Sequence, residues 1–128
     1  MSLFSFLKKK PEHLLLGKKG EETACRYLKK KGYSVLEQNY RSGKHEIDII
    51  ARAPDKRTVV FVEVKTRTDT KSMLPREAVG KSKQQYVRTA AQWYLRNTHI
   101  TGVPVRFDII EIYAKEDFRI VHLENAFS

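Results

Sequence analysis

Charged residues interrupt the most apolar stretches of this sequence, where a folded chain buries mainly hydrophobic side chains. Glu63 and Lys65 follow the run VVFV at 59–62, and Asp48 stands inside the apolar run 46–52. A buried charge is costly unless it is paired with an opposite charge or binds a metal. These positions are therefore the first candidates for residues that do chemistry.

The spacing of these charges predicts that they meet. Side chains alternate along a strand, so Glu63 and Lys65 share one face, about 7 Å apart by the strand rise. A helix is predicted over 17–31, in which Glu21 precedes Ala24 by three residues and therefore lies on the inward, apolar stripe. Three acids and one lysine are expected to converge on one end of a sheet.

Hydrolysis of a phosphodiester bond is the reaction that this set of residues suits. It needs a hard cation that offsets phosphate charge and lowers the pKa of a water. Magnesium prefers carboxylate and water oxygens, usually with one or two protein carboxylates. We expect Mg²⁺, or Mn²⁺, to bind Asp48, Glu63 and the main-chain carbonyl of Val64. Lys65 is expected to orient the water or stabilise the developing charge, and Glu21 to hold a metal-bound water or a second metal.

Each charge also has an ordinary structural explanation. Glu63 and Lys65 can form a cross-strand salt bridge at a sheet edge, and Asp48 can be a turn or cap acid at a strand end. Glu21 can complement the dipole at a helix N-terminus. The occurrence of all four in the order Glu, Asp, Glu-x-Lys favours a shared site over four separate explanations.

Hydrophobic periodicity and turn residues define the elements that must position these side chains. Two helices are predicted, over 17–31 and 75–97, and five strands, over 33–40, 46–52, 58–66, 105–113 and 118–123. The order α-β-β-β-α-β-β indicates a three-layer α/β/α domain around a mixed central sheet. The length of 128 residues suits one domain. We expect that domain to span 17–128 and to follow a basic, flexible N-terminal arm, 1–16.

The charge balance points to a polyanionic partner. There are 25 Lys and Arg against 15 Asp and Glu, a net charge of +10, which fits nucleic acid first and an anionic membrane surface second. No apolar run reaches the roughly 20 residues of a membrane span. The single cysteine, Cys25, excludes a disulfide framework and fits a buried core position in a cytoplasmic protein.

Some polar residues close to the acids in the sequence, or on the second helix, are candidates for phosphate contacts, with an ordinary solvated surface as the alternative. They are Arg41, Lys44, Arg67, Lys81 and Gln84. On that helix, Trp93 and Tyr94 have the spacing of core residues, so we expect both to pack inside the protein.

The ordered set of motifs resembles the PD-(D/E)xK nuclease superfamily and, more closely, the YraN family of small bacterial proteins. The matching segments are GxxGExxAxxYL at 17–28, NYR at 39–41, EIDIIA at 46–51, VFVEVKTR at 60–67, PxEAV at 75–79, Lys81 and RFDII at 106–110. The family usually has Gly where this chain has His45, so the local loop geometry is expected to differ there.

The resemblance implies a restriction-endonuclease-like fold and kinship with archaeal Holliday-junction resolvases. It assigns metal binding to Asp48 and Glu63, the catalytic lysine role to Lys65 and an accessory acid role to Glu21. It also implies DNA, including branched DNA, as the partner, a homodimer, and no small-molecule cofactor.

Three hypotheses follow. The first is a metal-dependent DNA endonuclease selective for branched or recombination-type DNA. The second is a non-catalytic nucleic-acid-binding accessory protein that retains the fold, since fold ancestry does not fix activity. The third is a membrane-surface adaptor that uses the basic arm at 1–16.

Overall fold

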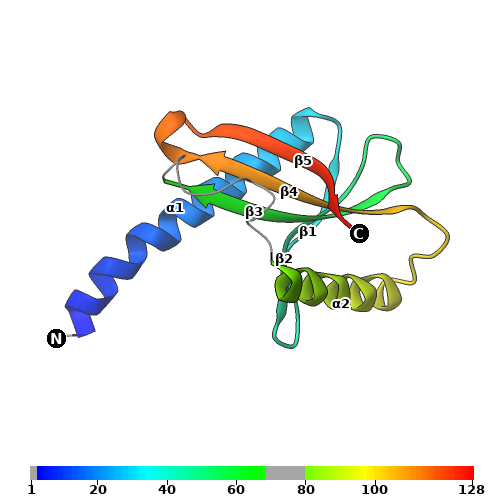
Figure 1. The fold of residues 1–128 in the computed structure, drawn as a ribbon, viewed down its shortest axis with the longest axis horizontal. Coiled ribbons are helices and arrows are strands. Elements are labelled where there is room, and N and C mark those ends of the chain that lie inside the picture. The colour runs from blue at the N-terminus through cyan, green and yellow to red at the C-terminus, as the bar shows by residue number, and fades with distance from the viewer. Residues whose placement is uncertain (1–2, 69–79) are drawn as a thin grey trace.

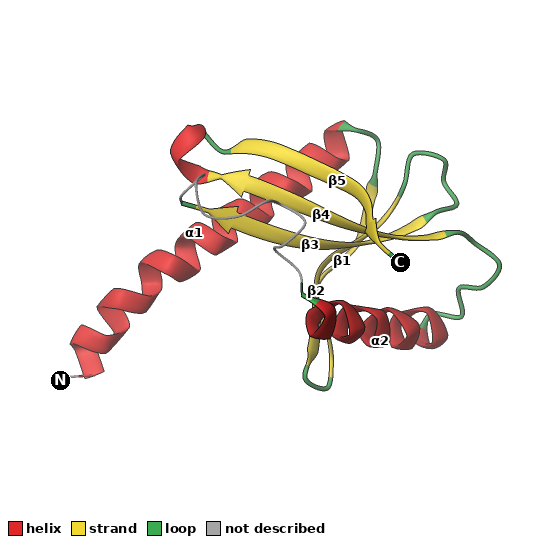
Figure 2. Ribbon diagram, in the orientation of Figure 1, coloured by secondary structure: helices red, strands yellow, loops and turns green. Residues whose placement is uncertain are grey.

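The computed structural model describes residues 3–68 and 80–128, which form a five-stranded sheet and two long helices (Figures 1 and 2). The elements in chain order are α1 (Leu3–Lys30), β1 (Ser34–Ser42), β2 (His45–Arg52), β3 (Val59–Arg67), α2 (Lys81–Asn97), β4 (Val105–Tyr113), the 3₁₀ turn η2 (Ala114–Glu116) and β5 (Arg119–Phe127). The predicted order of elements is therefore confirmed. No helix of this described part is both long and apolar enough to cross a membrane.

The sheet is mixed, and its strands lie in chain order, β1-β2-β3-β4-β5. Neighbouring strands are antiparallel except for β3 and β4, which are parallel. Parallel neighbours need a crossover connection, and α2 lies in the segment that joins them. In the parallel register, Glu63 lies opposite Ile109 and Lys65 lies opposite Glu111.

The two helices cover opposite faces of the sheet and create two cores, which gives the predicted three layers (Figure 2). On one face, Ala24 and Leu28 of α1 pack with a cluster that contains Val62 of β3. On the other face, α2 residues such as Ala90 pack with a cluster that contains Phe61 of β3. Alternate β3 side chains thus enter different cores, as the period of a strand requires.

The start of the first helix differs from the prediction. α1 begins at Leu3 and not at Gly17, so the range expected to be an arm, 1–16, is helical from its third residue. This part of α1 projects beyond the sheet (Figure 1). The helix start predicted at Pro75 lies outside the described residues, and α2 is observed from Lys81.

The sheet splits beside the predicted acids. The ladder between β2 and β3 runs from Arg52 opposite Val59 to Ile49 opposite Val62. The ladder between β1 and β2 continues further, to the hairpin turn beyond His45. The β1–β2 hairpin bends away from β3 and passes the N-terminal end of α2 (Figure 1). The β2-facing edge of β3 is therefore not paired with β2 beyond Val62.

A close helix–strand contact places α1 against the opened part of β3. A Cβ atom built on Gly20 would overlap the Oγ1 atom of Thr66. Only glycine leaves room for this approach. Since Glu21 is the next residue, the packing of Gly20 fixes how near the Glu21 carboxylate comes to β3.

The Gly20 contact predicts a position-dependent effect of alanine. Gly20→Ala should lower the free energy of unfolding by about 1–3 kcal/mol, because it overpacks a tight contact. Gly17→Ala is the matched control: it meets nothing within 4 Å and should stabilise the helix by up to about 1 kcal/mol. Urea denaturation measures both values. The double variant Gly20→Ala/Thr66→Ala should recover part of the loss, and additive losses would contradict the proposed overlap.

Candidate active site

Asp48 lies where β2 separates from β3, and its carboxylate replaces the missing strand partner. The Val64 amide donates a hydrogen bond of 2.7 Å to Asp48 Oδ2. In a strand, the N–H and C=O groups of one residue face the same neighbour. The Val64 carbonyl therefore faces the same opening as its amide. The structure thus brings Asp48 and the Val64 main chain together.

Glu63 is the buried acid of the site, with 5% of its surface exposed. It shares the α2 side of β3 with Lys65, as the strand alternation predicts. Its Oε1 atom lies 3.3 Å from Lys65 Nζ and 3.6 Å from Lys83 Nζ. Lys83 comes from α2 and was not among the predicted residues, because the contact depends on how α2 sits on the sheet. One carboxylate oxygen of Glu63 therefore has two ammonium groups beside it.

Glu21 approaches the site from α1. It is half-buried and lines a hollow of about 260 Å³ together with Val64 and Thr66. Burial raises the pKa of Glu21 above its ordinary value, and so does the negative charge of Glu46; a hydrogen bond with the Asn39 side chain opposes the shift. Glu63 adds a further repulsion. Glu21 is therefore repelled by the negative charge of the nearby acids Glu46 and Glu63.

The pKa of Asp48 is raised for similar reasons. Burial, followed by repulsion from Glu63, raises the pKa of Asp48 to about 7. The hydrogen bond from the Val64 amide lowers it, and Glu21 raises it further. Removing a charge from water and placing like charges nearby both disfavour the ionised form. A cation bound at this point would relieve the repulsion that keeps the proton on Asp48.

The donors fit a hard cation held by few protein ligands. Within residues 3–68 and 80–128, no three His, Cys, Asp or Glu side chains are placed to hold one ion together. Direct binding by Glu21, Asp48 and Glu63 at once is therefore not the observed arrangement. Two carboxylates, one main-chain carbonyl and waters form a donor set typical of magnesium. Asp48, Glu63 and the Val64 carbonyl could supply this set.

Arg67, for which a phosphate contact is expected, forms an ion pair inside the sheet. Its Nε atom lies 3.2 Å from Oε2 of Glu111, which is buried on β4. Glu111 lies opposite Lys65 in the sheet, so it is a second carboxylate beside that lysine. Arg67 balances the charge of Glu111, while Lys65 pairs with Glu63. The Glu111 contact depends on the pairing of two distant strands, which the sequence around Arg67 does not reveal.

The other residues expected to contact phosphate are at the surface or beside the site. Arg41 is exposed and lies 3.5 Å from Glu46. Lys44 is exposed in the β1–β2 turn, and Lys81 is exposed at the start of α2. The Gln84 side chain accepts a hydrogen bond of 3.2 Å from Arg88.

The expectation that two aromatic residues of α2 are core residues is half right. Tyr94 is buried and contacts Tyr40 edge to face, with ring centroids 5.2 Å apart. Trp93 is 46% exposed, which overturns its assignment to the core. Trp93 is one residue, or about 100° of helix rotation, away from Tyr94 and therefore falls outside the buried stripe.

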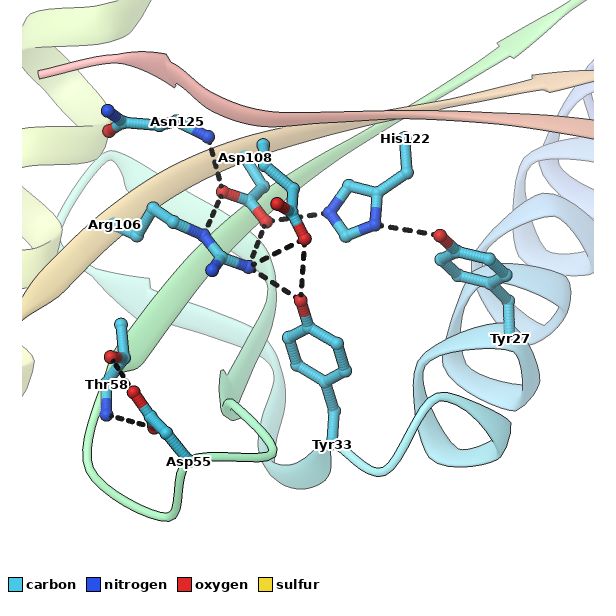
Figure 3. A network of polar contacts seen from close by, with 9 residues as sticks. Tyr27, Tyr33, Asp55, Thr58, Arg106, Asp108, His122 and Asn125 are labelled. Carbon is cyan, nitrogen blue, oxygen red and sulfur yellow. Dashed lines mark hydrogen bonds and ion pairs between the residues drawn. The ribbon is translucent and has the colours of Figure 1, made fainter.

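A second polar cluster, missed by the sequence analysis, lies on the α1 face of the sheet (Figure 3). Its centre is Asp108 of β4, which is fully buried. Asp108 accepts two hydrogen bonds of 2.9 Å from Arg106 and one of 2.9 Å from the Asn125 amide. Its Oδ2 atom is 2.7 Å from Nε2 of His122. An acid inside the apolar run 105–113 was the available signal, since the same signal identified Asp48.

The cluster connects β4 and β5 to the end of α1. Tyr27 Oη lies 3.0 Å from Nδ1 of His122, and the Arg106 guanidinium donates a hydrogen bond of 2.6 Å to Tyr33 Oη. Burial alone would raise the pKa of Asp108, but the hydrogen bonds from His122 and Arg106 outweigh it and keep the pKa below its ordinary value. Arg106 and His122 therefore stabilise the charge of Asp108 within the cluster, whereas Asp48 is surrounded by other acids.

The two clusters predict different responses to mutation. Asp108→Ala should lower the free energy of unfolding by about 3–5 kcal/mol, because it leaves buried donors without an acceptor. Glu124→Gln is the control, since Glu124 is 61% exposed and lies 3.7 Å from the same arginine; its effect should stay below about 1 kcal/mol. Chemical denaturation of both variants provides the measurement. A loss in Asp108→Ala as small as the loss in Glu124→Gln would show that the buried network does not stabilise the fold.

The raised pKa of Asp48 predicts how the metal-free protein responds to pH. The folded state holds a proton on Asp48 up to about pH 7, whereas an unfolded Asp releases it near pH 4. The free energy of unfolding should therefore fall as the pH rises from about 4 to 7, by at most about 1.4 kcal/mol per pH unit. Asp48→Asn keeps an acceptor for Val64 and should flatten this slope.

Asp55→Asn is the control for the pH experiment. Hydrogen bonds from Thr58 and Arg57 lower the pKa of Asp55 to about 2, so its protonation changes stability only below about pH 4. Asp55→Asn should therefore shift the stability by a constant amount and leave the slope between pH 5 and pH 8 unchanged. Thermal unfolding in EDTA from pH 5 to pH 8 measures the slopes. An Asp48→Asn curve parallel to the wild type would rule out an elevated pKa at Asp48.

Comparison with known proteins gives a family that matches most of the chain. The model of UPF0102, described as an uncharacterised protein family, matches residues 20–112. A UPF0102 protein of Pelobacter propionicus is 42% identical over 120 residues, which cover 92% of this chain and 86% of that protein. A UPF0102 protein of Alkaliphilus oremlandii is 46% identical over 115 residues, which cover 88% and 97% of the two chains.

A solved structure adds no support to the family assignment. The chain is similar to SfsA of Pyrococcus furiosus, solved in complex with Ca²⁺, at 14% identity and a TM-score of 0.28, over 88% of this chain and 63% of that one. A likeness at this TM-score supports no argument about fold or function. The family model and the bacterial relatives carry the assignment instead, and they confirm the predicted YraN resemblance. The chain belongs to the uncharacterised protein family UPF0102.

Proposed function

We propose that this chain is a metal-dependent endonuclease that hydrolyses phosphodiester bonds in DNA. The observation that carries the proposal is the meeting of Asp48, the Val64 main chain, Glu63 and Lys65 where β2 leaves β3. A bound Mg²⁺ or Mn²⁺ would offset phosphate charge and lower the pKa of a water. Asp48, Glu63 and the Val64 carbonyl would hold it.

Lys65 and Lys83 have complementary parts in this proposal. Both ammonium groups lie near the same oxygen of Glu63, at 3.3 Å and 3.6 Å. Lys65 can turn towards a phosphate while Lys83 remains at Glu63, so the buried carboxylate keeps a cation. An ammonium at the phosphate stabilises the charge that develops as the bond breaks. Glu21, on the other side of Val64, would accept a hydrogen bond from the attacking water.

The polarity of the surface favours a nucleic acid as the substrate. The chain carries a net charge of +10, and α2, which contributes Lys83 to the site, contains four Lys and Arg and no acid. Cations near a phosphodiester backbone supply most of the affinity for nucleic acid. Selectivity for branched DNA rests on the resemblance to resolvases, and it is tested by comparing cleavage of linear and branched DNA.

A specific observation also supports the alternative of a non-catalytic nucleic-acid-binding protein. Glu63 is already balanced by two lysines, so the site is electrically satisfied at that residue without a metal. A protein of this kind would bind DNA with a strong dependence on salt and none on divalent cations.

A cleavage panel tests the proposal. The full chain is incubated with linear, nicked, flapped and four-way DNA in Mg²⁺, in Mn²⁺ and in EDTA. We expect nicking that depends on the metal, and a rate reduced at least about 100-fold in Asp48→Asn and in Lys65→Met. The control is Arg119→Gln, which alters the exposed Glu116 ion pair and should leave the rate unchanged.

Binding measurements separate the two candidate functions. Asp48→Asn should retain affinity for DNA in EDTA, because it removes no cation. Salt-dependent binding by wild-type protein without cleavage of any panel member would reject the nuclease and support the accessory protein. If the wild-type protein neither binds nor cleaves DNA, both functions are rejected.

A further inference from the structure

We propose that the solvent face of α2 binds unpaired nucleotides, whose bases stack on Tyr86 and Trp93. This inference rests on the proposed function, because it identifies the kind of DNA that the site would receive. Tyr86 is 50% exposed and Trp93 is 46% exposed. Both are large flat side chains on a helix whose buried stripe packs against the sheet and lies about 100° of helix rotation away from them.

The two rings lie on the same face of the helix. Tyr86 and Trp93 are seven residues apart, which is nearly two full turns, so their directions differ by only about 20°. Their separation along the helix axis is about 10 Å. The buried stripe of α2, which includes Val87 and Tyr94, faces the sheet instead. The exposed rings thus form a short line along the outside of α2, which we call the aromatic track.

Neighbouring residues hold or complement both rings. The Tyr86 ring stacks on His45 of β2, with ring centroids 4.9 Å apart and planes inclined by 27°. The guanidinium of Arg96 lies over one face of the Trp93 ring, 5.5 Å from its centre. A ring fixed in orientation can stack on a base at a low cost in side-chain entropy. An arginine beside a ring supplies a positive charge for the phosphate that accompanies the base.

The charges of α2 select a nucleic acid over a neutral or cationic partner. The helix carries Lys81, Lys83, Arg88 and Arg96, and its sequence contains no Asp or Glu. Exposed aromatic rings between cations are the typical arrangement of surfaces that bind single strands, because every base offers a flat face. Bases inside a duplex already stack on one another, so only unpaired bases can use the track.

The track begins at the candidate active site. Lys83 lies 3.6 Å from Glu63 and precedes Tyr86 by three residues, or just under one turn. Trp93 lies about two turns further along α2. A nucleotide chain that stacks on both rings would therefore run from the proposed metal site along the helix. The substrate that fits this path has an unpaired segment next to the bond that is cut, as in a flap, an open end or a branch point.

The intrinsic fluorescence of the protein tests this inference directly. Trp93 is the only tryptophan of the chain, so a base that stacks on it should quench the signal. The full chain is titrated in EDTA with a 12-nucleotide dT oligonucleotide and, separately, with a blunt duplex of equal length. We expect saturable quenching by the single strand and little quenching by the duplex.

Variants identify the contribution of each ring. Tyr86→Ala should weaken single-strand binding about tenfold, the typical effect of losing one stacked base, whereas Tyr86→Phe should bind like the wild type. Trp93→Phe has no signal, so its affinity is measured by the anisotropy of a labelled oligonucleotide, and it should remain close to that of the wild type. Val105→Ala, which alters another exposed apolar residue, is the matched control and should change nothing.

The possible results are distinguishable from a failure of the nuclease proposal, because binding is measured without metal or cleavage. Equal quenching by single strand and duplex, or an unchanged affinity in Tyr86→Ala, would overturn the track even if the protein cuts DNA. A Trp93 signal that changes with protein concentration and not with DNA would overturn it as well, and would identify a second copy of the chain as the occupant. Quenching by the single strand without any cleavage would support the track and reject the nuclease.

Discussion

The hydrogen bond between the Val64 amide and the Asp48 carboxylate decides how the two halves of the sheet meet. Main-chain N–H groups inside a fold need an acceptor, because a buried donor without one costs about 1–3 kcal/mol. The part of β2 before Ile49 is not paired with β3, and there Asp48 supplies that acceptor from its side chain. This contact permits an opening in the sheet without an unpaired amide. The Val64 carbonyl and the carboxylates of Glu63 and Glu21 then face or border the opening.

Asp108 also has a carboxylate that accepts a main-chain hydrogen bond, and its surroundings differ from those of Asp48 in charge. Asp108 also accepts a main-chain N–H, from Asn125, where the ladder between β4 and β5 is irregular. Arg106 and His122 surround Asp108 and hold its pKa down, whereas Glu63 and Glu21 surround Asp48 and drive its pKa up. One aspartate therefore completes a self-sufficient structural network (Figure 3). The other leaves an excess of negative charge, which is the condition for binding a cation.

The sequence contained enough information for the strands and for the acids that interrupt them. The run before Glu63 has the composition of a strand buried on both faces, and the structure places that strand between both helices. Local patterns could not reveal contacts between distant elements. Lys83 reaches Glu63, and Arg67 reaches Glu111, only through the packing of α2 and the register of β4. The exposure of Trp93 was missed because a helical stripe predicts its centre better than its edge.

Under the proposed function, the position of α2 over the open end of the sheet would couple nucleic-acid binding to the candidate active site. Its buried side packs with Phe61, two residues before Glu63 on the same face of β3, so the position of the helix and that of the acid are coupled. Its first turn brings Lys83 to Glu63, and its outer side carries Tyr86, stacked on His45 three residues before Asp48. A strand of nucleotides lying on the helix would be located by the same contacts that locate the carboxylates. A rigid helix can in this way align a flexible polyanion with a small site, and no separate specificity domain is needed for that alignment.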